Sequence, residues 1–384
     1  MFFVSLQSKQ LSNTKLLKSH PSQKRVALIE FASSHDECLL TQIISLKDSN
    51  CWVRLVTNQT IRDRNENLEN LVDEWVDIDP RGVGILGAAI GDALIIRRLM
   101  RSLKRDKIEL VIFNTAQGGH VRNACLFSLF HKIEFAGIVH TIRKFNGSFT
   151  QKIIHLKIIN YFVLAEFLKE QIPPQNKLQI EAFYPLAFPK NDGEISEENP
   201  TEKDTVLFAL IGGVELRRKD LIGFVSIVQQ CGENVRFAFL GKADPEHPDV
   251  IELKKNLTEI NCLNRVDFFD KNLNSDTMNR ILRNSNAILP LIHPNTPSCN
   301  EYFRNQIPGA MNIALGHNIP LLLHESFERI AELNSASVYY RLEDFSIAFD
   351  ELKSLHDSLR KAMRLNENYS VEFQRKKYAE FLFS

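Results

Sequence analysis

A dense group of cations follows a glycine pair at the end of an apolar run. The group consists of Arg217, Arg218 and Lys219. The apolar run covers residues 206–211, and Gly212 and Gly213 close it. Arginine offers a two-pronged hydrogen-bond donor and lysine a compact positive charge, so this group suits a phosphate or diphosphate. Gly213 would let such a ligand approach the backbone closely.

A second feature suited to phosphate is the helix start predicted at Pro308, Gly309 and Ala310. Proline has no N–H to lose at that position, and glycine leaves the backbone accessible. The first turn of a helix carries unpaired N–H groups and the positive end of the helix dipole. Both features would therefore meet one anionic ligand if the fold brings them together.

The elements that must position these residues follow from the alternation of short apolar runs with longer amphipathic stretches. This pattern is typical of βαβ units and parallel sheets. We expect strands at 26–31, 52–57, 110–114, 135–140 and 161–165, and then at 206–211, 235–240, 266–269, 287–291 and 319–323. The first helix is expected to start near Ser34. The predicted fold class is α/β, with two Rossmann-like domains facing across a cleft.

The two series of strands are separated by residues 189–204, which have two prolines and almost no apolar residues. Such a segment is typical of a linker or hinge, the alternative being an ordinary surface loop. The predicted organisation is a polar leader at 1–24, a first domain at 25–188, the linker at 189–204, a second domain at 205–355 and a C-terminal helix at 356–384.

Composition excludes some classes of function. Basic and acidic residues each number 47, which argues against a dedicated nucleic-acid binder. No apolar run is long enough to span a membrane, and the leader is too polar for a signal peptide. The six scattered cysteines form no C-x-x-C pair, which disfavours a metal site or disulfide framework and favours a cytoplasmic location.

Three segments of the second half carry a resemblance to a known family. They are Gly212 to Asp220, the strand end Phe239-Leu240-Gly241, and residues 287–323, which include Pro290, Glu301, the helix from Gly309 and Gly316-His-Asn-Ile-Pro320. In order and spacing they resemble the donor-binding domain of retaining GT-B glycosyltransferases, especially glycosyltransferase family 4. That family has a second glutamate eight positions after the first, where this sequence has Gly309.

The resemblance implies roles for residues in both halves. Residues Gly213, Arg217, Arg218, Lys219, Gly309 and Ala310 would bind a nucleotide-diphosphate sugar. Glu301 would position the sugar, and His140, at a predicted strand end, would face it. The family's glycine-rich loop after the first strand is replaced by Ala32 to His35, so His35 is expected on the acceptor side. The polar loop with Gln117, Gly118 and His120 would line the same side.

The implied activity is sugar transfer to a glycan or lipid-linked acceptor, as in polysaccharide biosynthesis, with retention of configuration. No cofactor and no metal is expected, because the cations and the helix dipole would replace a metal at the leaving diphosphate. Two alternatives remain open. One is another GT-B enzyme, such as a sugar-nucleotide epimerase or an inverting transferase. The other is a GT-B-like binding or scaffold protein without catalysis, which the missing second glutamate would explain.

Two further patterns have weaker functional interpretations. Gly82, Gly84 and Gly87 have G-x-G-x-x-G spacing, but no convincing apolar strand precedes them, so a dinucleotide site is not expected. Residues Ala93 to Lys107 form a basic amphipathic stretch. Such a helix could rest on the inner face of a membrane, the alternative being a domain helix with a solvated basic face.

Overall fold

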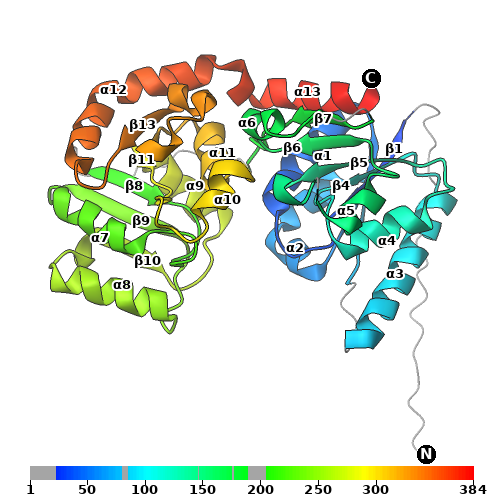
Figure 1. The fold of residues 1–384 in the computed structure, drawn as a ribbon, viewed down its shortest axis with the longest axis horizontal. Coiled ribbons are helices and arrows are strands. Elements are labelled where there is room, and N and C mark those ends of the chain that lie inside the picture. The colour runs from blue at the N-terminus through cyan, green and yellow to red at the C-terminus, as the bar shows by residue number, and fades with distance from the viewer. Residues whose placement is uncertain (1–22, 80–84, 146, 175–176, 189–204) are drawn as a thin grey trace, which may run out of the picture.

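The computed structural model describes residues 23–79, 85–145, 147–174, 177–188 and 205–384. They form two α/β domains, each built on a parallel sheet flanked by helices (Figure 1). The predicted linker at 189–204, most of the predicted leader and the glycines Gly82 and Gly84 lie outside the described residues.

The first domain has a seven-stranded sheet in the order β3-β2-β1-β4-β5-β6-β7. Its strands are β1 (Arg25–Ile29), β2 (Trp52–Thr57), β3 (Glu74–Asp77), β4 (Leu110–Phe113), β5 (Glu134–Val139), β6 (Asn160–Val163) and β7 (Gln179–Ala182). Its helices are α1 (Leu39–Asp48), α2 (Gln59–Arg64), α3 (Ile85–Arg105), α4 (Gly119–Phe127), α5 (Phe149–Ile154) and α6 (Glu166–Glu170).

The second domain has a six-stranded sheet in the order β10-β9-β8-β11-β12-β13. Its strands are β8 (Val206–Leu210), β9 (Val235–Lys242), β10 (Val266–Phe269), β11 (Ala287–Ile288), β12 (Leu321–His324) and β13 (Ser337–Tyr340). Its helices are α7 (Leu221–Gln230), α8 (Pro248–Glu259), α9 (Ser275–Asn284), α10 (Cys299–Arg304), α11 (Gly309–His317) and α12 (Phe345–Leu365), and α13 (Val371–Phe383) follows.

Both sheets reverse their strand order beside the first strand of the domain, between β1 and β4 and between β8 and β11. Loops that leave adjacent strands in opposite directions open a crevice at the carboxyl ends of the strands, where ligands bind in such folds. The fold therefore identifies two edges where functional residues should gather. The predicted α/β class with two Rossmann-like domains is confirmed.

The ten predicted strands are present, although β11 contains only two residues. Strands β3, β7 and β13 were not predicted. A strand does end shortly before the G-x-G-x-x-G segment, which corrects the prediction there. The start of the first helix is also corrected: a 3-10 turn at Asp36–Cys38 precedes α1, which begins at Leu39.

The C-terminal helices join the two domains. The predicted boundary between residues 355 and 356 falls inside α12, and a separate helix, α13, packs against α1 of the first domain (Figure 1). The Tyr378 ring stacks on Phe162 with centroids 4.5 Å apart, and its hydroxyl donates to Gln42. The end of the chain therefore helps to stabilise the first domain.

The basic amphipathic stretch lies in α3. Its apolar residues Ile96, Leu99, Met100 and Leu103 are buried in the first-domain core, whereas Arg97, Arg98 and Arg101 are exposed. The exposed side of the helix therefore carries these charges, while the four apolar residues face the core. Within the described residues, no helix combines the length and apolar character needed to cross a bilayer.

Candidate active site

The predicted cations lie in a turn at the carboxyl end of β8, before α7 begins. The backbone N–H groups of Arg218 and Lys219 both donate to the carbonyl oxygen of Glu215, at 3.0 and 2.9 Å. The side chains of Arg217 and Arg218 are largely exposed, and each approaches the Glu215 carboxylate, at 3.5 and 3.3 Å. Both guanidinium groups thus lie at the surface, where an anionic ligand can exchange with Glu215.

Lys219 points inward from the same turn. Its side chain is buried, and Nζ donates to the carbonyl oxygen of Ile211 at 2.7 Å. Burial, together with the neighbouring Arg218, lowers the pKa of Lys219 to about 8. Gly212 has a φ of +87°, and a β-carbon there would lie 3.4 Å from Nζ. The ammonium group therefore lies directly beneath the glycine turn.

Gly241 explains how β9 supports this turn. A β-carbon at position 241 would lie 2.2 Å from the carbonyl carbon of Gly212 and 2.4 Å from the nitrogen of Gly213. Only glycine lets the two backbones approach this closely. The end of β9 therefore holds the glycine turn in position.

A buried hydrogen-bonded chain fixes the end of the cationic turn. Nδ1 of His293 lies 2.8 Å from the Asp220 carboxylate, and Nε2 lies 2.6 Å from the Tyr340 hydroxyl. Burial raises the pKa of Asp220, but hydrogen bonds from His293 and Gly223 outweigh it and lower the pKa overall. Leu291, whose carbonyl accepts the N–H of Asp220, has a φ of +57°. His293 lies outside the helices and strands, and no local sequence pattern announces its buried contacts with Asp220 and Tyr340.

Glu301 lies in the short helix α10. Helix α11 begins at Gly309 as predicted, where a β-carbon would meet nothing within 4 Å, while Ala310 is buried. The hydroxyl of Ser298, just before α10, donates to the carbonyl oxygen of Arg217 at 2.8 Å. The α10 segment and the cationic turn are therefore in direct contact.

The first-domain edge centres on Glu30, directly after β1. Its buried carboxylate accepts hydrogen bonds from the Asn114 amide, the Thr115 hydroxyl and the N–H of Ala32, at 2.7, 2.6 and 2.7 Å. Burial raises the pKa of Glu30 despite these bonds. The Asn114 side chain in turn accepts a hydrogen bond from Gln42, which itself accepts one from the Tyr378 hydroxyl. Sequence analysis missed this buried polar chain from α13 to the domain edge.

His140 follows β5 and lies against His35, with ring centroids 3.8 Å apart. Nε2 of His140 lies 2.8 Å from the carbonyl oxygen of Asn114, and because a carbonyl only accepts, Nε2 carries the proton. Burial lowers the pKa of His140 to about 3, with a contribution from His35. At neutral pH the ring is uncharged, and Nδ1 is a hydrogen-bond acceptor. His35 adopts a φ of +68°, so the loop is locally strained.

The polar loop after β4 contributes the remaining predicted residues. Gln117 donates to the carbonyl oxygen of Thr141, beside His140, and Gly118 has a φ of +91° just before α4. His120 lies 3.0 Å from the Asp92 carboxylate. Gln117, Gly118 and His120 line one cavity of about 400 Å³ together with Glu30 and Thr115. The predicted acceptor-side residues of this loop therefore lie together.

Among the described residues, His35, Glu37 and His140 form a group of potential metal ligands whose ligand atoms all lie within 4.8 Å of one another. Ligands of a tetrahedral zinc ion lie about 3.4 Å apart. Moreover, one nitrogen of His140 is occupied by Asn114, and the His35 and His140 rings are stacked with an interplanar angle of 26°. The arrangement fits a stacked histidine pair better than a metal site.

The first-domain and second-domain edges are in direct contact through their loops. Nη1 of Arg143, three residues after His140, lies 2.9 Å from the carboxylate of Glu301. The N–H of Ile142 donates to the carbonyl oxygen of Asn305 at 2.9 Å. The loop after β5 therefore contacts α10, which brings the His140 and Glu301 segments together. A cavity of about 1100 Å³ beside Phe188 also lies between the domains, but no predicted site residue lines it.

Comparison with known proteins identifies the fold. The chain resembles the structure of Anabaena HepE in complex with UDP and glucose, with a TM-score of 0.68 and 13% identity over 94% of this chain and 99% of that one. The chain has the GT-B fold. A glycosyltransferase from Rickettsia africae is also similar, with a TM-score of 0.64 and 12% identity over 94% and 99% of the two chains.

The GT-B likeness extends to a different kind of enzyme. The UDP-GlcNAc 2-epimerase from Neisseria meningitidis bound to UDP-GlcNAc gives a TM-score of 0.59 at 13% identity, over 93% of this chain and 99% of that chain. No protein-family model and no curated protein matches the sequence. The resemblance to family 4 therefore stays a prediction, while the GT-B architecture that it implied is confirmed.

Proposed function

We propose that this GT-B protein is a glycosyltransferase that uses a nucleotide-diphosphate sugar. One observation carries the proposal: the cationic turn of the second domain contacts the α10 segment, and α10 meets the His140 loop of the first domain. Sites for a diphosphate and for a sugar would then adjoin at the domain interface. The similar GT-B structures with UDP bound support this arrangement.

The second domain would hold the leaving diphosphate. Arg217 and Arg218 would exchange Glu215 for phosphate oxygens, and Lys219 would lie below them beneath the glycine turn. The start of α11 at Gly309 would add backbone N–H donors. Negative charge grows on the diphosphate as the glycosidic bond breaks, so these positive groups lower the barrier. In this proposal no metal and no cofactor takes part.

The interface residues would orient the sugar. Nδ1 of His140 would accept a hydrogen bond from a sugar hydroxyl, which its uncharged state allows. Glu301 would bind the sugar only after exchanging its partner Arg143. By the resemblance to family 4, transfer would retain the anomeric configuration. The acceptor, a glycan or lipid-linked glycan, would enter beside Glu30 and Gln117. The reaction would take place in the cytoplasm.

An epimerase acting on a sugar nucleotide is the second candidate, because UDP-GlcNAc 2-epimerases share the fold over nearly the whole chain. A transferase releases the nucleotide and needs an acceptor. An epimerase returns the intact sugar nucleotide with one inverted centre. Product analysis by NMR therefore separates the two, and ligand binding without turnover would indicate a scaffold protein.

Thermal-shift screening against UDP-, GDP- and other nucleotide sugars tests the proposal. We expect one nucleotide to raise the melting temperature of the wild type but not of Lys219→Ala. The matched control is Lys255→Ala, an exposed lysine on α8, which should respond like the wild type. If no nucleotide stabilises the wild type, or if Lys219→Ala responds fully, the proposed donor site is refuted.

A further inference from the structure

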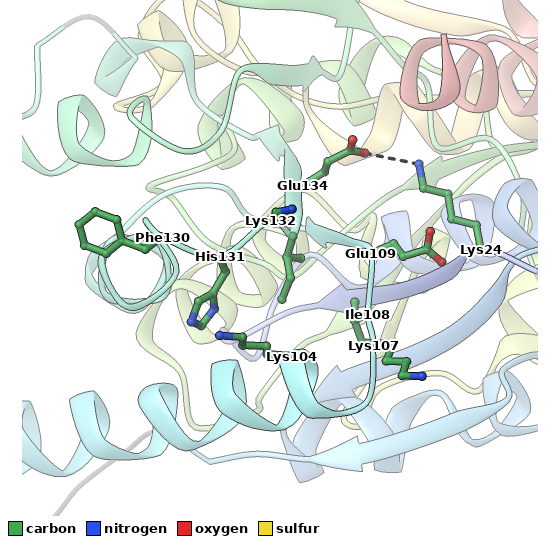
Figure 2. A pocket seen from close by; sticks show the side chains of 10 residues that line it. Lys24, Lys104, Lys107, Ile108, Glu109, Phe130, His131, Lys132 and Glu134 are labelled. Atoms are coloured by element: carbon green, nitrogen blue, oxygen red, sulfur yellow. Dashed lines mark hydrogen bonds and ion pairs between the residues drawn. The ribbon is translucent and has the colours of Figure 1, made fainter.

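The amino ends of strands β1, β4 and β5 form a face opposite to the candidate active site. A hollow of about 600 Å³ opens there, lined by Lys24, Lys104, Lys107, Ile108, Glu109, Phe130, His131, Lys132, Ile133 and Glu134. Figure 2 shows the lysines around this hollow and Phe130 at its rim. We call this surface the basic hollow.

Phe130 is the most exposed large apolar residue of the described chain, at 99%. It lies in the turn after α4, next to Phe127, which is 36% exposed. Leu156, 69% exposed, belongs to the same region, because the adjacent Lys157 donates to the carbonyl oxygen of His131 at 2.8 Å. Exposed aromatic and aliphatic side chains that cluster in this way mark an interaction surface.

The charges of the basic hollow are unbalanced. Glu134 pairs with Lys24, and Glu109 accepts from the N–H of Arg25. Among the residues that the structure describes, no carboxylate pairs with Lys104, Lys107 or Lys132. The exposed basic side of α3, with Arg97, Arg98 and Arg101, continues this positive surface. The pKa of His131 is lowered by burial and by Lys104 and Lys157, which is consistent with a positive local field.

From these contacts we infer that the basic hollow docks the protein on an anionic phospholipid surface. Phe130 inserts between the lipid head groups, while Lys104, Lys107 and Lys132 bind their phosphates. An exposed apolar tip beside a group of cations is a pattern by which peripheral proteins bind such membranes. A second copy of the chain fits less well, because a two-fold contact through this face would bring unpaired lysines together.

The docking differs from the one that the amphipathic sequence of α3 suggested. Ile96, Leu99, Met100 and Leu103 of α3 are buried and only Leu94 of that stretch is largely exposed, so the apolar contact comes mainly from the Phe130 turn and α3 supplies mainly charge. Because the basic hollow lies at the amino ends of the strands, docking leaves the active-site edge free.

Sedimentation with phosphatidylcholine vesicles, with and without phosphatidylglycerol, tests this inference. We expect binding only to the anionic vesicles, weakened by added salt. Phe130→Ser should reduce the affinity about tenfold, and Lys104→Glu with Lys132→Glu by roughly tenfold or more. Ile222→Ser on α7 and Lys255→Glu on α8 are matched controls, because both side chains are exposed in the second domain.

The inference is overturned if neutral vesicles bind equally, or if Phe130→Ser binds like the wild type. It is also overturned if analytical ultracentrifugation shows a dimer that Phe130→Ser dissociates, since a second copy would then cover this face. The proposed function is tested separately, because Phe130→Ser should keep the thermal shift with the nucleotide sugar. Loss of vesicle binding with a retained shift therefore separates docking from the donor site.

Discussion

The two domains present opposite kinds of chemistry at their facing edges. In the first domain, Glu30, Asn114 and His140 are buried and joined by short hydrogen bonds. In the second domain, Arg217 and Arg218 are exposed and paired only with a surface carboxylate. A buried, fully bonded network is fixed before a ligand arrives, whereas exposed long side chains keep their rotamer freedom.

Under the proposed function, this difference would give the two edges distinct tasks. The first edge offers a preorganised surface for a neutral, hydroxyl-rich molecule, since its histidine is uncharged and its carboxylate is already satisfied. The second edge offers mobile positive charge over one buried lysine, which suits a ligand that gains charge during the reaction. Substitutions at the first edge should therefore mainly reduce stability, whereas substitutions at the second edge should mainly affect ligand binding.

Replacing Glu30 gives the largest expected effect. Glu30→Ala removes the acceptor for the Asn114 amide and the Thr115 hydroxyl, so the free energy of unfolding should fall by about 2–4 kcal/mol. Urea denaturation measures this change. Arg218→Ala on the other edge is the control and should change stability by less than about 0.5 kcal/mol. Equal losses for both variants would contradict a preorganised first edge.

Gly241 and Gly309 have different roles at the second edge. Gly241 lets two backbone segments pack closely, whereas Gly309 would leave the backbone accessible to a ligand. Gly241→Ala would force the glycine turn to move, which should cost about 1–3 kcal/mol of stability. Gly309→Ala has free space and should leave the melting temperature almost unchanged. If phosphate approaches the start of α11, Gly309→Ala should nevertheless weaken donor binding, which calorimetry would detect. A stable Gly241→Ala protein would show that the turn can relax.

In the proposed donor site, Lys219 should make donor binding depend on pH, whereas His140 should not. The pKa of Lys219 is about 8, so phosphate affinity should fall by up to about tenfold per pH unit above pH 8. Between pH 8 and 10.5 the unfolded chain binds more protons than the folded one, so stability from this group rises while affinity falls. Affinity titrated from pH 7 to 10 in wild type and Lys219→Met checks this, because the variant should lose the dependence.

The sequence predicted the second edge better than the first for a physical reason. Arg217, Arg218 and Lys219 are contiguous, so one turn brings them together whatever the rest of the fold does. Glu30 and Asn114 meet across 84 positions of the chain, and Asp220 and His293 across 73, so no local pattern announces either pair. The available signal was Glu30 itself, a carboxylate within the apolar run predicted as a strand at 26–31.

The same logic explains which strands could be predicted. Central strands such as β1 and β8 are covered on both faces and appear as continuous apolar runs. The missed strands β3, β7 and β13 all lie at sheet edges and have four residues each. Strands β3 and β7 are only partly buried, so their apolar signal is weak, whereas β13 is mostly buried but short. The two α/β domains were thus predictable from the central strands, whereas the GT-B assignment came from the resemblance of the second-half segments.

The contact between the edges provides the smallest and most selective test. Arg143 and Glu301 are 62% and 31% exposed, so their ion pair should contribute less than about 1 kcal/mol. Arg143→Gln should therefore leave unfolding almost unchanged. If Glu301 exchanges Arg143 for the donor sugar, the variant should bind the donor up to about fivefold more tightly, because the competing ion pair is gone.

A double-mutant cycle with Glu301→Gln isolates this exchange from other effects of either substitution. Glu301→Gln alone should weaken donor binding, and the gain from Arg143→Gln should vanish when both changes are combined. A gain that persists without the carboxylate would place the effect of Arg143 on the phosphates instead. The two edges would then compete for charge, and Glu301 would serve only to hold the domains together.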